Sequence, residues 1–159
     1  MANKIFNTDK RIKLGVWGLG RGGDLITCCK ALNIDVVAGC DFNEHIRENF
    51  RKHAPDVFLT ADEDEFLAQD MDAVLVATWF MDHAKHSIKA LNAGKHVMCE
   101  VTSFYTPAEA VALVEAVEKS GKVYNLLENY PFMKPNMIAK KLWDDGLFGE
   151  FLYGEYDYN

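Results

Sequence analysis

The apolar stretch Ile12-Lys-Leu-Gly-Val-Trp17 runs directly into the glycine cluster Gly18-Leu-Gly20-Arg-Gly-Gly23, and this junction decides the fold. The glycines have the spacing G-x-G-x-x-G, and a second apolar run over residues 34–40 leads to Asp41, eighteen residues after Gly23. A strand, a glycine turn, a helix, a second strand and an acid in this order form the fingerprint of a dinucleotide-binding βαβ unit.

Each glycine of this turn has its own expected task. We expect Gly18 to allow the tight turn, Gly20 to let the backbone approach a pyrophosphate, and Gly23 to let the helix pack closely on the sheet. Gly22 lies in the same turn, and Arg21 adds a charge at the edge of the cofactor. The free amides and the dipole at the start of the helix favour phosphate groups.

The acid at position 41 predicts which dinucleotide is bound. We expect Asp41 to accept hydrogen bonds from the hydroxyls of the adenosine ribose and to repel a 2′-phosphate. Neither Phe42 nor Asn43 supplies a compensating cation, so NAD is favoured over NADP, although Arg47 follows one turn later. A domain that has lost its cofactor, or that binds another adenosine ligand, is the alternative.

Composition narrows the partners and the compartment. The 159 residues can form one full domain with a small appendage, and the net charge of −7 argues against nucleic acid or an anionic membrane as partner. No apolar stretch approaches the ~20 residues of a membrane span, and the N-terminus lacks a signal-peptide core. We expect a cytoplasmic protein with four reduced, buried thiols, Cys28, Cys29, Cys40 and Cys99.

Apolar runs alternate with helical patterns along most of the chain. Strands are expected near 12–17, 34–40, 57–60, 73–77, 96–100 and 123–127, and helices near 22–32, 43–53, 63–68, 83–93, 107–120 and 135–145. The strands are apolar throughout, which is typical of a parallel sheet covered on both faces. This alternation predicts an α/β fold with a doubly wound parallel sheet, a Rossmann fold.

The helix at 107–120 carries signals at both ends. Thr106 is the expected N-cap, and Glu109 completes a capping box. Pro107 occupies the first helical position, and Gly121 is the expected stop.

The last residues depart from the alternating pattern. We expect an NAD-binding domain over residues 1–127, and a linker helix with the start of a C-terminal substrate domain over 128–159. The aromatic segment 149–158 is predicted to be the first strand of that second domain, because Phe151, Tyr153 and Tyr158 are too apolar for a free edge. We therefore expect a truncated piece of a longer protein. Packing onto the first domain, or dimerisation, is the alternative.

Several segments resemble one known family. Asp72-Ala-Val-Leu-Val-Ala-Thr78, His83, Ala90-Leu-Asn-Ala-Gly-Lys-His-Val97 and Glu100 are similar, in this order, to the N-terminal domain of the Gfo/Idh/MocA family. The resemblance implies an NAD-dependent oxidoreductase that transfers hydride to or from a sugar, polyol or glycoside. It also implies a C-terminal α/β domain built on a large open sheet, and leaves homo-oligomerisation through that domain open.

One departure from the family concerns proton transfer. The family usually follows its glutamate with lysine and proline, and that lysine helps to bind substrate and to move the alcohol proton. Here Val101 and Thr102 follow, and valine cannot accept a proton. Tyr130 and Lys134 are the nearby groups of high pKa that we name as catalytic replacements; otherwise the protein does not oxidise alcohols in the ordinary way.

A subgroup of the family resembles the chain more closely. Its members have Glu-Val, Glu-Asn followed by an aromatic residue, and Gly-Leu-Phe-Gly-Glu at the corresponding places. This chain has Glu100-Val101, Glu128-Asn129-Tyr130 and Gly146-Leu-Phe-Gly-Glu150. That subgroup includes NAD-dependent glycoside hydrolases, which oxidise a sugar carbon transiently, eliminate the aglycone, add water and reduce again. This redox-assisted glycosidase is one alternative function, and a non-catalytic NAD(H)-binding sensor or scaffold is the other.

Further cofactor contacts are expected where the later strands end. Thr78 and Trp79 follow the fourth strand, with Trp79 either a cofactor contact or a core anchor. His83 is expected to touch cofactor or substrate, with a catalytic role, or to cap its helix. By resemblance Glu100 supports the cofactor or its ring amide, and Asn129 belongs to the same site.

No metal site is expected. His83 and His86 are three residues apart, but no further ligand accompanies them. The acidic run 62–65 is interpreted as a helix start stabilised by the helix dipole.

Overall fold

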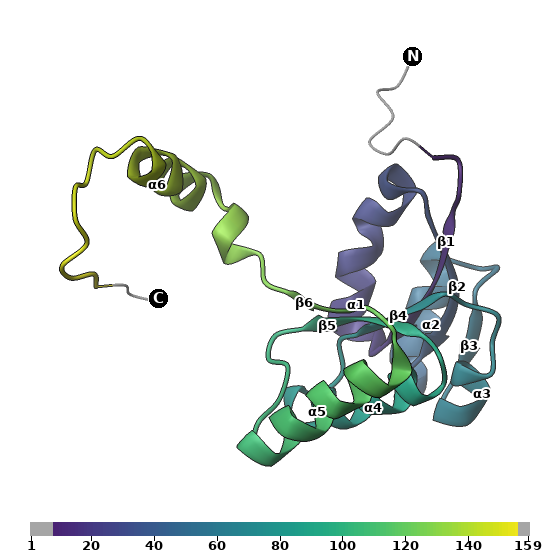
Figure 1. Cartoon of the computed structure of the whole chain (residues 1–159). Helices are drawn as coiled ribbons and strands as arrows, with labels where there is room; N and C mark the ends of the chain where they lie inside the picture. Colours follow the sequence, from purple (N-terminus) through teal and green to yellow (C-terminus); the bar gives the residue numbers. More distant parts are fainter. Residues whose placement is uncertain (1–7, 156–159) are drawn as a thin grey trace. The chain divides into compact units, whose positions relative to one another are not determined.

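The structure is a computed structural model that describes residues 8–155, the side chain at position 30 apart (Figure 1). The chain divides into two compact units, Met1–Leu127 and Glu128–Asn159. Each unit is described by itself.

The first unit is built on six parallel strands in the order β3-β2-β1-β4-β5-β6. Their bounds are β1 (Ile12–Trp17), β2 (Ile34–Cys40), β3 (Phe58–Thr60), β4 (Ala73–Val76), β5 (His96–Glu100) and β6 (Tyr124–Leu127). The chain moves outward from β1 to β3 and then restarts at β4 on the other side of β1. The predicted doubly wound parallel sheet is therefore confirmed.

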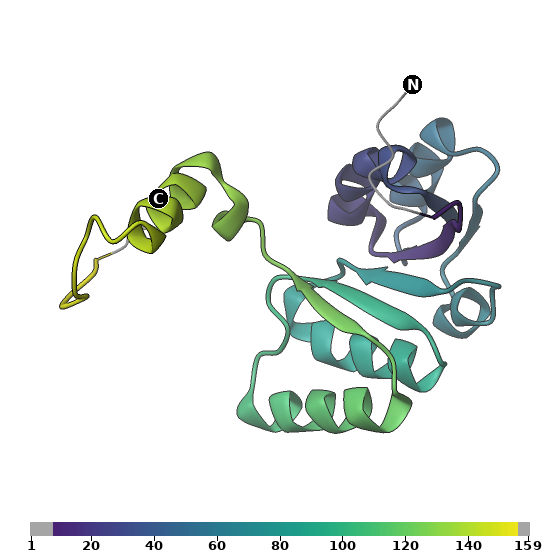
Figure 2. The same cartoon turned by 45° about the horizontal axis from the view of Figure 1, so that its top comes forward.

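Helices cover both faces of this sheet (Figure 2). Their bounds are α1 (Leu19–Leu25), η1 (Ile26–Leu32), α2 (Glu44–His53), α3 (Glu63–Leu67), η2 (Phe80–Asp82), α4 (His83–Asn92) and α5 (Pro107–Ser120), where η denotes a 3₁₀ helix. One apolar cluster joins Leu19 of α1 and Phe50 of α2 to the sheet, and another joins Leu91 of α4 and Leu113 of α5 to its other face. Successive residues of the central strand β4, Ala73 and Val74, enter opposite clusters, as a strand buried on both faces requires.

The signals predicted for α5 are present in the structure. The Thr106 side chain accepts a hydrogen bond from the Glu109 amide, and the Glu109 carboxylate accepts one from the Thr106 amide. Gly121 ends the helix with a φ of 62°. Local capping chemistry therefore fixes this helix at both ends.

The helix after β1 begins earlier than predicted. It starts at Leu19 instead of residue 22, and its second half, residues 26–32, is a 3₁₀ helix. Gly18 permits this early start because it reverses the chain at a φ of 89°, and a Cβ there would lie 2.4 Å from the Ala77 carbonyl oxygen. The expectation of four buried thiols is wrong for Cys28, which is exposed in η1, while Cys29, Cys40 and Cys99 are buried.

Close packing of α1 on the sheet depends on Gly22 and not, as predicted, on Gly23. A Cβ at Gly22 would lie 2.6 Å from Cγ1 of the buried Val16 on β1. A Cβ at Gly23 would only reach ordinary contact with Phe50, at 3.5 Å. The spacing motif predicts correctly that a glycine lies at the helix–sheet contact. Because α1 starts early, Gly22 and not Gly23 faces the sheet.

The second unit contains η3 (Tyr130–Phe132) and α6 (Lys134–Asp144). The strand expected over 149–158 is not formed over residues 149–155, and residues 156–158 lie outside the described part. A strand requires a partner for its ladder of hydrogen bonds, and none of the described residues supplies one. The aromatic side chains pack locally instead, with Phe151 5.6 Å from Trp143 between ring centroids. Among the described residues, none of the helices has the length and hydropathy that spanning a membrane would require.

The two glycines of α1 provide a matched test of helix–sheet packing. We expect Gly22→Ala to lower the free energy of unfolding by about 1–3 kcal/mol, because the new methyl group overpacks against stiff Val16. Gly23→Ala is the control, and should be neutral or stabilising by about 0.5–1 kcal/mol, because alanine favours the helix and the space is available. Chemical denaturation measures both values, and an equal or larger loss for Gly23→Ala would contradict the assignment.

Candidate functional site

The predicted cofactor residues meet at the carboxyl edge of the sheet, where β1 lies between β2 and β4. A pocket of about 270 Å³ opens there, between the glycine turn and the loops after β2, β3 and β4. Of the predicted residues, Gly18, Gly20, Arg21, Asp41, Thr78 and Trp79 line it. This edge is the topological switch point, where open α/β sheets bind their ligands.

The glycine turn leaves room for a phosphate group. Gly20 and Arg21 occupy the second and third positions of α1, where backbone amides have no acceptor within the helix. A Cβ at Gly20 would meet no atom within 4 Å, so this side of the turn is open. The turn thus has both donors and space for a pyrophosphate.

Asp41 is buried, with 8% of its surface exposed, and its carboxylate organises the turn. Oδ2 accepts a hydrogen bond from the Leu19 amide, and Oδ1 accepts one from the Asn43 amide, both at 2.9 Å. Each carboxylate oxygen has a second lone pair, so both can still accept a bond from a ribose hydroxyl. Arg47, the cation that argued for NADP, donates to the backbone oxygen of Asp41 at 2.7 Å. Its guanidinium is therefore engaged with the main chain.

Arg21 and Glu100, predicted separately as cofactor residues, bind each other. Nε of Arg21 lies 2.9 Å from Oε1 of Glu100, which joins the glycine turn to the end of β5. Their side chains are 52% and 15% exposed, so the pair is anchored on the glutamate side. The residues are 79 positions apart, and no spacing signal could have revealed this pair.

His83 lies beneath the site and does not open into it. It is 1% exposed, with Nδ1 2.7 Å from the Thr102 carbonyl oxygen and Nε2 3.1 Å from that of Thr78. Its side chain does not cap α4, because both nitrogens face carbonyls of other loops. Burial lowers the pKa of His83, but contact with Cys99 and the two carbonyls outweighs it, so the net pKa is raised. His83 ties together the loops that follow β4 and β5.

His86 forms part of the pocket wall, a role that sequence reasoning missed. Its ring stacks on Trp17, 4.2 Å between centroids, and its Nδ1 lies 2.8 Å from the Thr78 hydroxyl. Burial lowers the pKa of His86 more than nearby Glu63 raises it, so its net pKa is lowered. Burial also raises the pKa of the wall thiol Cys40 to about 12.

Trp79 is not a core anchor, because 64% of its surface is exposed. Its ring leans on Phe80 at 4.6 Å between centroids, and it lines the pocket beside Thr78. The exposed indole leaves a cofactor contact as its surviving interpretation.

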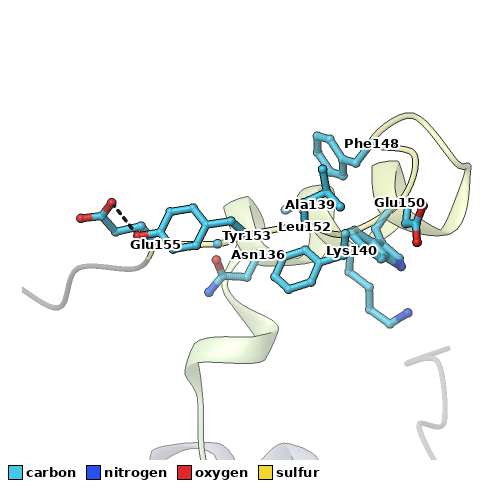
Figure 3. A pocket seen from close by; sticks show the side chains of 11 residues that line it. Asn136, Ala139, Lys140, Phe148, Glu150, Leu152, Tyr153 and Glu155 are labelled. Carbon is cyan, nitrogen blue, oxygen red and sulfur yellow. Dashed lines mark hydrogen bonds between the residues drawn. The ribbon is translucent and has the colours of Figure 1, made fainter.

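Three predicted residues, Asn129, Tyr130 and Lys134, belong to the second unit, and their roles stay predictions. That unit has its own hollow of about 760 Å³, lined by α6 and residues 148–155 (Figure 3). Its lining is largely apolar, and the hydrogen bond drawn there joins the Tyr153 hydroxyl to Glu155. Asn136, Glu150 and Glu155 are among its polar lining residues, and the hollow has no glycine turn of the kind found in the first unit. Over residues 8–155 no group of three or more His, Cys, Asp or Glu could hold a metal ion.

The fold and the pocket define a Rossmann nucleotide-binding domain. The family model described as "Oxidoreductase family, NAD-binding Rossmann fold" matches residues 12–127. The chain therefore belongs to the Gfo/Idh/MocA oxidoreductase family, as the sequence resemblance predicted.

The chain is also similar to curated and solved proteins. The chain is 25% identical over 159 residues to a glycosyl hydrolase family 109 protein of Shewanella sp. (strain W3-18-1), with 92% of the chain and 35% of that protein covered. An NAD-binding protein from Listeria innocua matches with a TM-score of 0.82 and 27% identity, over 89% of the chain and 42% of its own. Scyllo-inositol dehydrogenase from Lactobacillus casei, solved with NAD(H) and scyllo-inositol, matches with a TM-score of 0.81 and 25% identity, over 89% and 43%. The chain thus spans about a third of the length of its curated relatives.

His83 predicts a pH-dependent contribution to stability. Because its pKa is raised in the folded state, this contribution is full below the unfolded pKa and is lost as pH rises through the folded value. We expect His83→Leu to lower the free energy of unfolding by about 1–3 kcal/mol at pH 5.5, and by less at pH 8.5. Denaturation at the two pH values measures this, with the exposed His45→Leu as control. An equal loss at both values would contradict a charged His83.

Proposed function

We propose that this chain is the NAD-binding part of an oxidoreductase that acts on a sugar, polyol or glycoside. One observation carries the proposal: the open glycine turn and the buried Asp41 carboxylate line one pocket at the switch point of the sheet. Family membership and the inositol dehydrogenase among the similar structures support the substrate class. We further propose that the protein is cytoplasmic, in keeping with four cysteines that form no disulfide.

The residues of the pocket fit the dinucleotide. The amides of Gly20 and Arg21 would bind its phosphates, Asp41 its adenosine ribose, and Trp79 would cover it from the loop after β4. The bound cofactor would supply the hydride acceptor at its nicotinamide ring. We retain Glu100 as a proposed support for the nicotinamide half of the cofactor, since it forms an ion pair with Arg21 in the glycine turn.

Proton transfer has to come from other residues. Val101 follows β5 and is 39% exposed, but its side chain has no group that can accept a proton. The buried imidazole of His83 is engaged on both sides, so we no longer assign it to catalysis. Tyr130 and Lys134 remain our proposed acceptors, both from the second unit.

The names of the curated relatives favour a second candidate, a redox-assisted glycosidase. Such an enzyme would recycle its NAD within each turnover, since the sugar carbon is oxidised and then reduced again. The sugar hydroxyl would still lose a proton when its carbon is oxidised and regain one on reduction, so this candidate also needs a proton-holding group other than Val101.

Cofactor choice is tested by calorimetric titration. We expect the wild-type chain to bind NAD more tightly than NADP. Asp41→Asn should weaken NAD binding by roughly 10-fold and reduce the preference for NAD over NADP, because it removes the charge that binds the ribose hydroxyls and repels a 2′-phosphate. Asn retains an acceptor for one backbone amide, and thermal unfolding checks that the variant is folded.

Asp56→Asn is the matched control, because Asp56 is exposed and its substitution changes the net charge by the same amount as Asp41→Asn. It should leave both affinities unchanged. A wild-type preference for NADP would overturn the ribose assignment, and no binding of either nucleotide would overturn the proposed function.

The two enzymatic candidates differ in the fate of the cofactor. With NAD present, a polyol or sugar dehydrogenase accumulates NADH, measured at 340 nm, in proportion to product. A glycosidase releases nitrophenol from a 4-nitrophenyl glycoside and needs NAD, yet accumulates no NADH. Because we expect this part of the protein to have little activity alone, the assay uses the full-length protein, and turnover of neither class there, with NAD bound, would point to the sensor or scaffold alternative.

A further inference from the structure

Glu63 is a charged residue of the pocket that the proposed function leaves without a task. It is the first residue of α3, while Lys89 and His86 come from α4 (Figure 1). Its acidic run, residues 62–65, lies at a helix start as predicted, and Asp62 caps α3 by accepting hydrogen bonds from the Asp64 and Glu65 amides. Glu63 is not needed for that cap, and its side chain lines the pocket.

The two carboxylate oxygens of Glu63 have different environments. Oε2 accepts a hydrogen bond from Lys89 at 2.9 Å, and this bond is the main reason that the pKa of Glu63 is lowered. Oε1 has only a long contact, 3.6 Å, to Nε2 of His86. Lys89 is shared with Asp64, at 2.7 Å, so it fixes the carboxylate without covering its second oxygen. Glu63 therefore presents an ionised, oriented acceptor to a pocket in which its side chain is 36% exposed.

The position of the Glu63 carboxylate indicates which part of a bound dinucleotide it would contact. Phosphates belong at the glycine turn, and the ribose belongs at Asp41. The same pocket is lined by Phe42, Ile46 and Ala61, whose apolar atoms suit a flat ring, and by Glu63. A second carboxylate there would repel phosphate, and requires a hydrogen-bond donor on the base.

We propose that Glu63 is a specificity-determining residue that accepts a hydrogen bond from the exocyclic amine of the adenine base, and that Lys89 and His86 are its positioning residues. This inference rests on the proposed dinucleotide site. It makes a prediction beyond that site: a base with a carbonyl oxygen in place of the amine, as in hypoxanthine, would set an acceptor against the carboxylate and bind poorly.

The test compares NAD with nicotinamide hypoxanthine dinucleotide by calorimetric titration of the intact chain. We expect the wild-type protein to prefer NAD by roughly 10-fold or more. In Glu63→Gln the amide can donate to a carbonyl or accept from an amine, so the two affinities should converge to within about 3-fold. Asp64→Asn, which also removes a partner of Lys89 but lies on the exposed side, is the matched control and should keep the wild-type preference.

Each outcome has a distinct meaning. If the wild-type protein binds NAD and nicotinamide hypoxanthine dinucleotide equally tightly, the role proposed for Glu63 is overturned, while the proposed dinucleotide site is not. A preference that survives in Glu63→Gln, in protein with an unchanged melting curve, would also overturn it. Failure of the wild-type chain to bind either nucleotide would instead overturn the proposed function.

Discussion

The rest of the site depends on the hydrogen bonds between the Asp41 carboxylate and the amides of Leu19 and Asn43. A buried carboxylate is costly unless its oxygens are satisfied, and these two amides satisfy them at 2.9 Å each. They also join the start of α1 to the segment that begins α2, at the point where β1 and β2 end. The glycine turn is thus held in shape by a protein group, and the pocket exists before any ligand arrives.

Charge is distributed along the pocket according to this arrangement. The glycine turn contributes its free amides and the cation of Arg21 to the pocket, and Asp41, Glu63 and Asp82 contribute carboxylates. Two other wall residues are shifted toward their neutral forms, because burial lowers the pKa of His86 and raises that of Cys40. A ligand that is anionic in its middle and carries hydroxyl and amine donors at one end matches this order.

Features encoded within a few residues could be predicted from the sequence, while long-range contacts could not. Thr106 and Glu109 predicted the start of α5 and Gly121 predicted its end, because capping chemistry is local, and the apolar runs predicted the strands of the sheet. The glycine motif predicted a turn correctly but named Gly23 where Gly22 packs on Val16, since the early start of α1 sets which glycine faces the sheet. The tail over 149–155 has strand-like composition, yet a strand requires a partner. The pairing of Arg21 with Glu100 joins residues far apart in sequence, as does that of His83 with Thr102, and composition carries no signal for either.

Helix α4 carries three of the polar contacts around the site, spaced three residues apart. His83 ties the loops after β4 and β5, His86 forms the pocket wall, and Lys89 holds Glu63. Because they share one rigid helix, a one-residue shift in the register of α4 would rotate all three by about 100° and remove every contact together. Side chains of α4 can therefore be substituted one at a time, whereas a change in the length of the helix would disrupt all three contacts together.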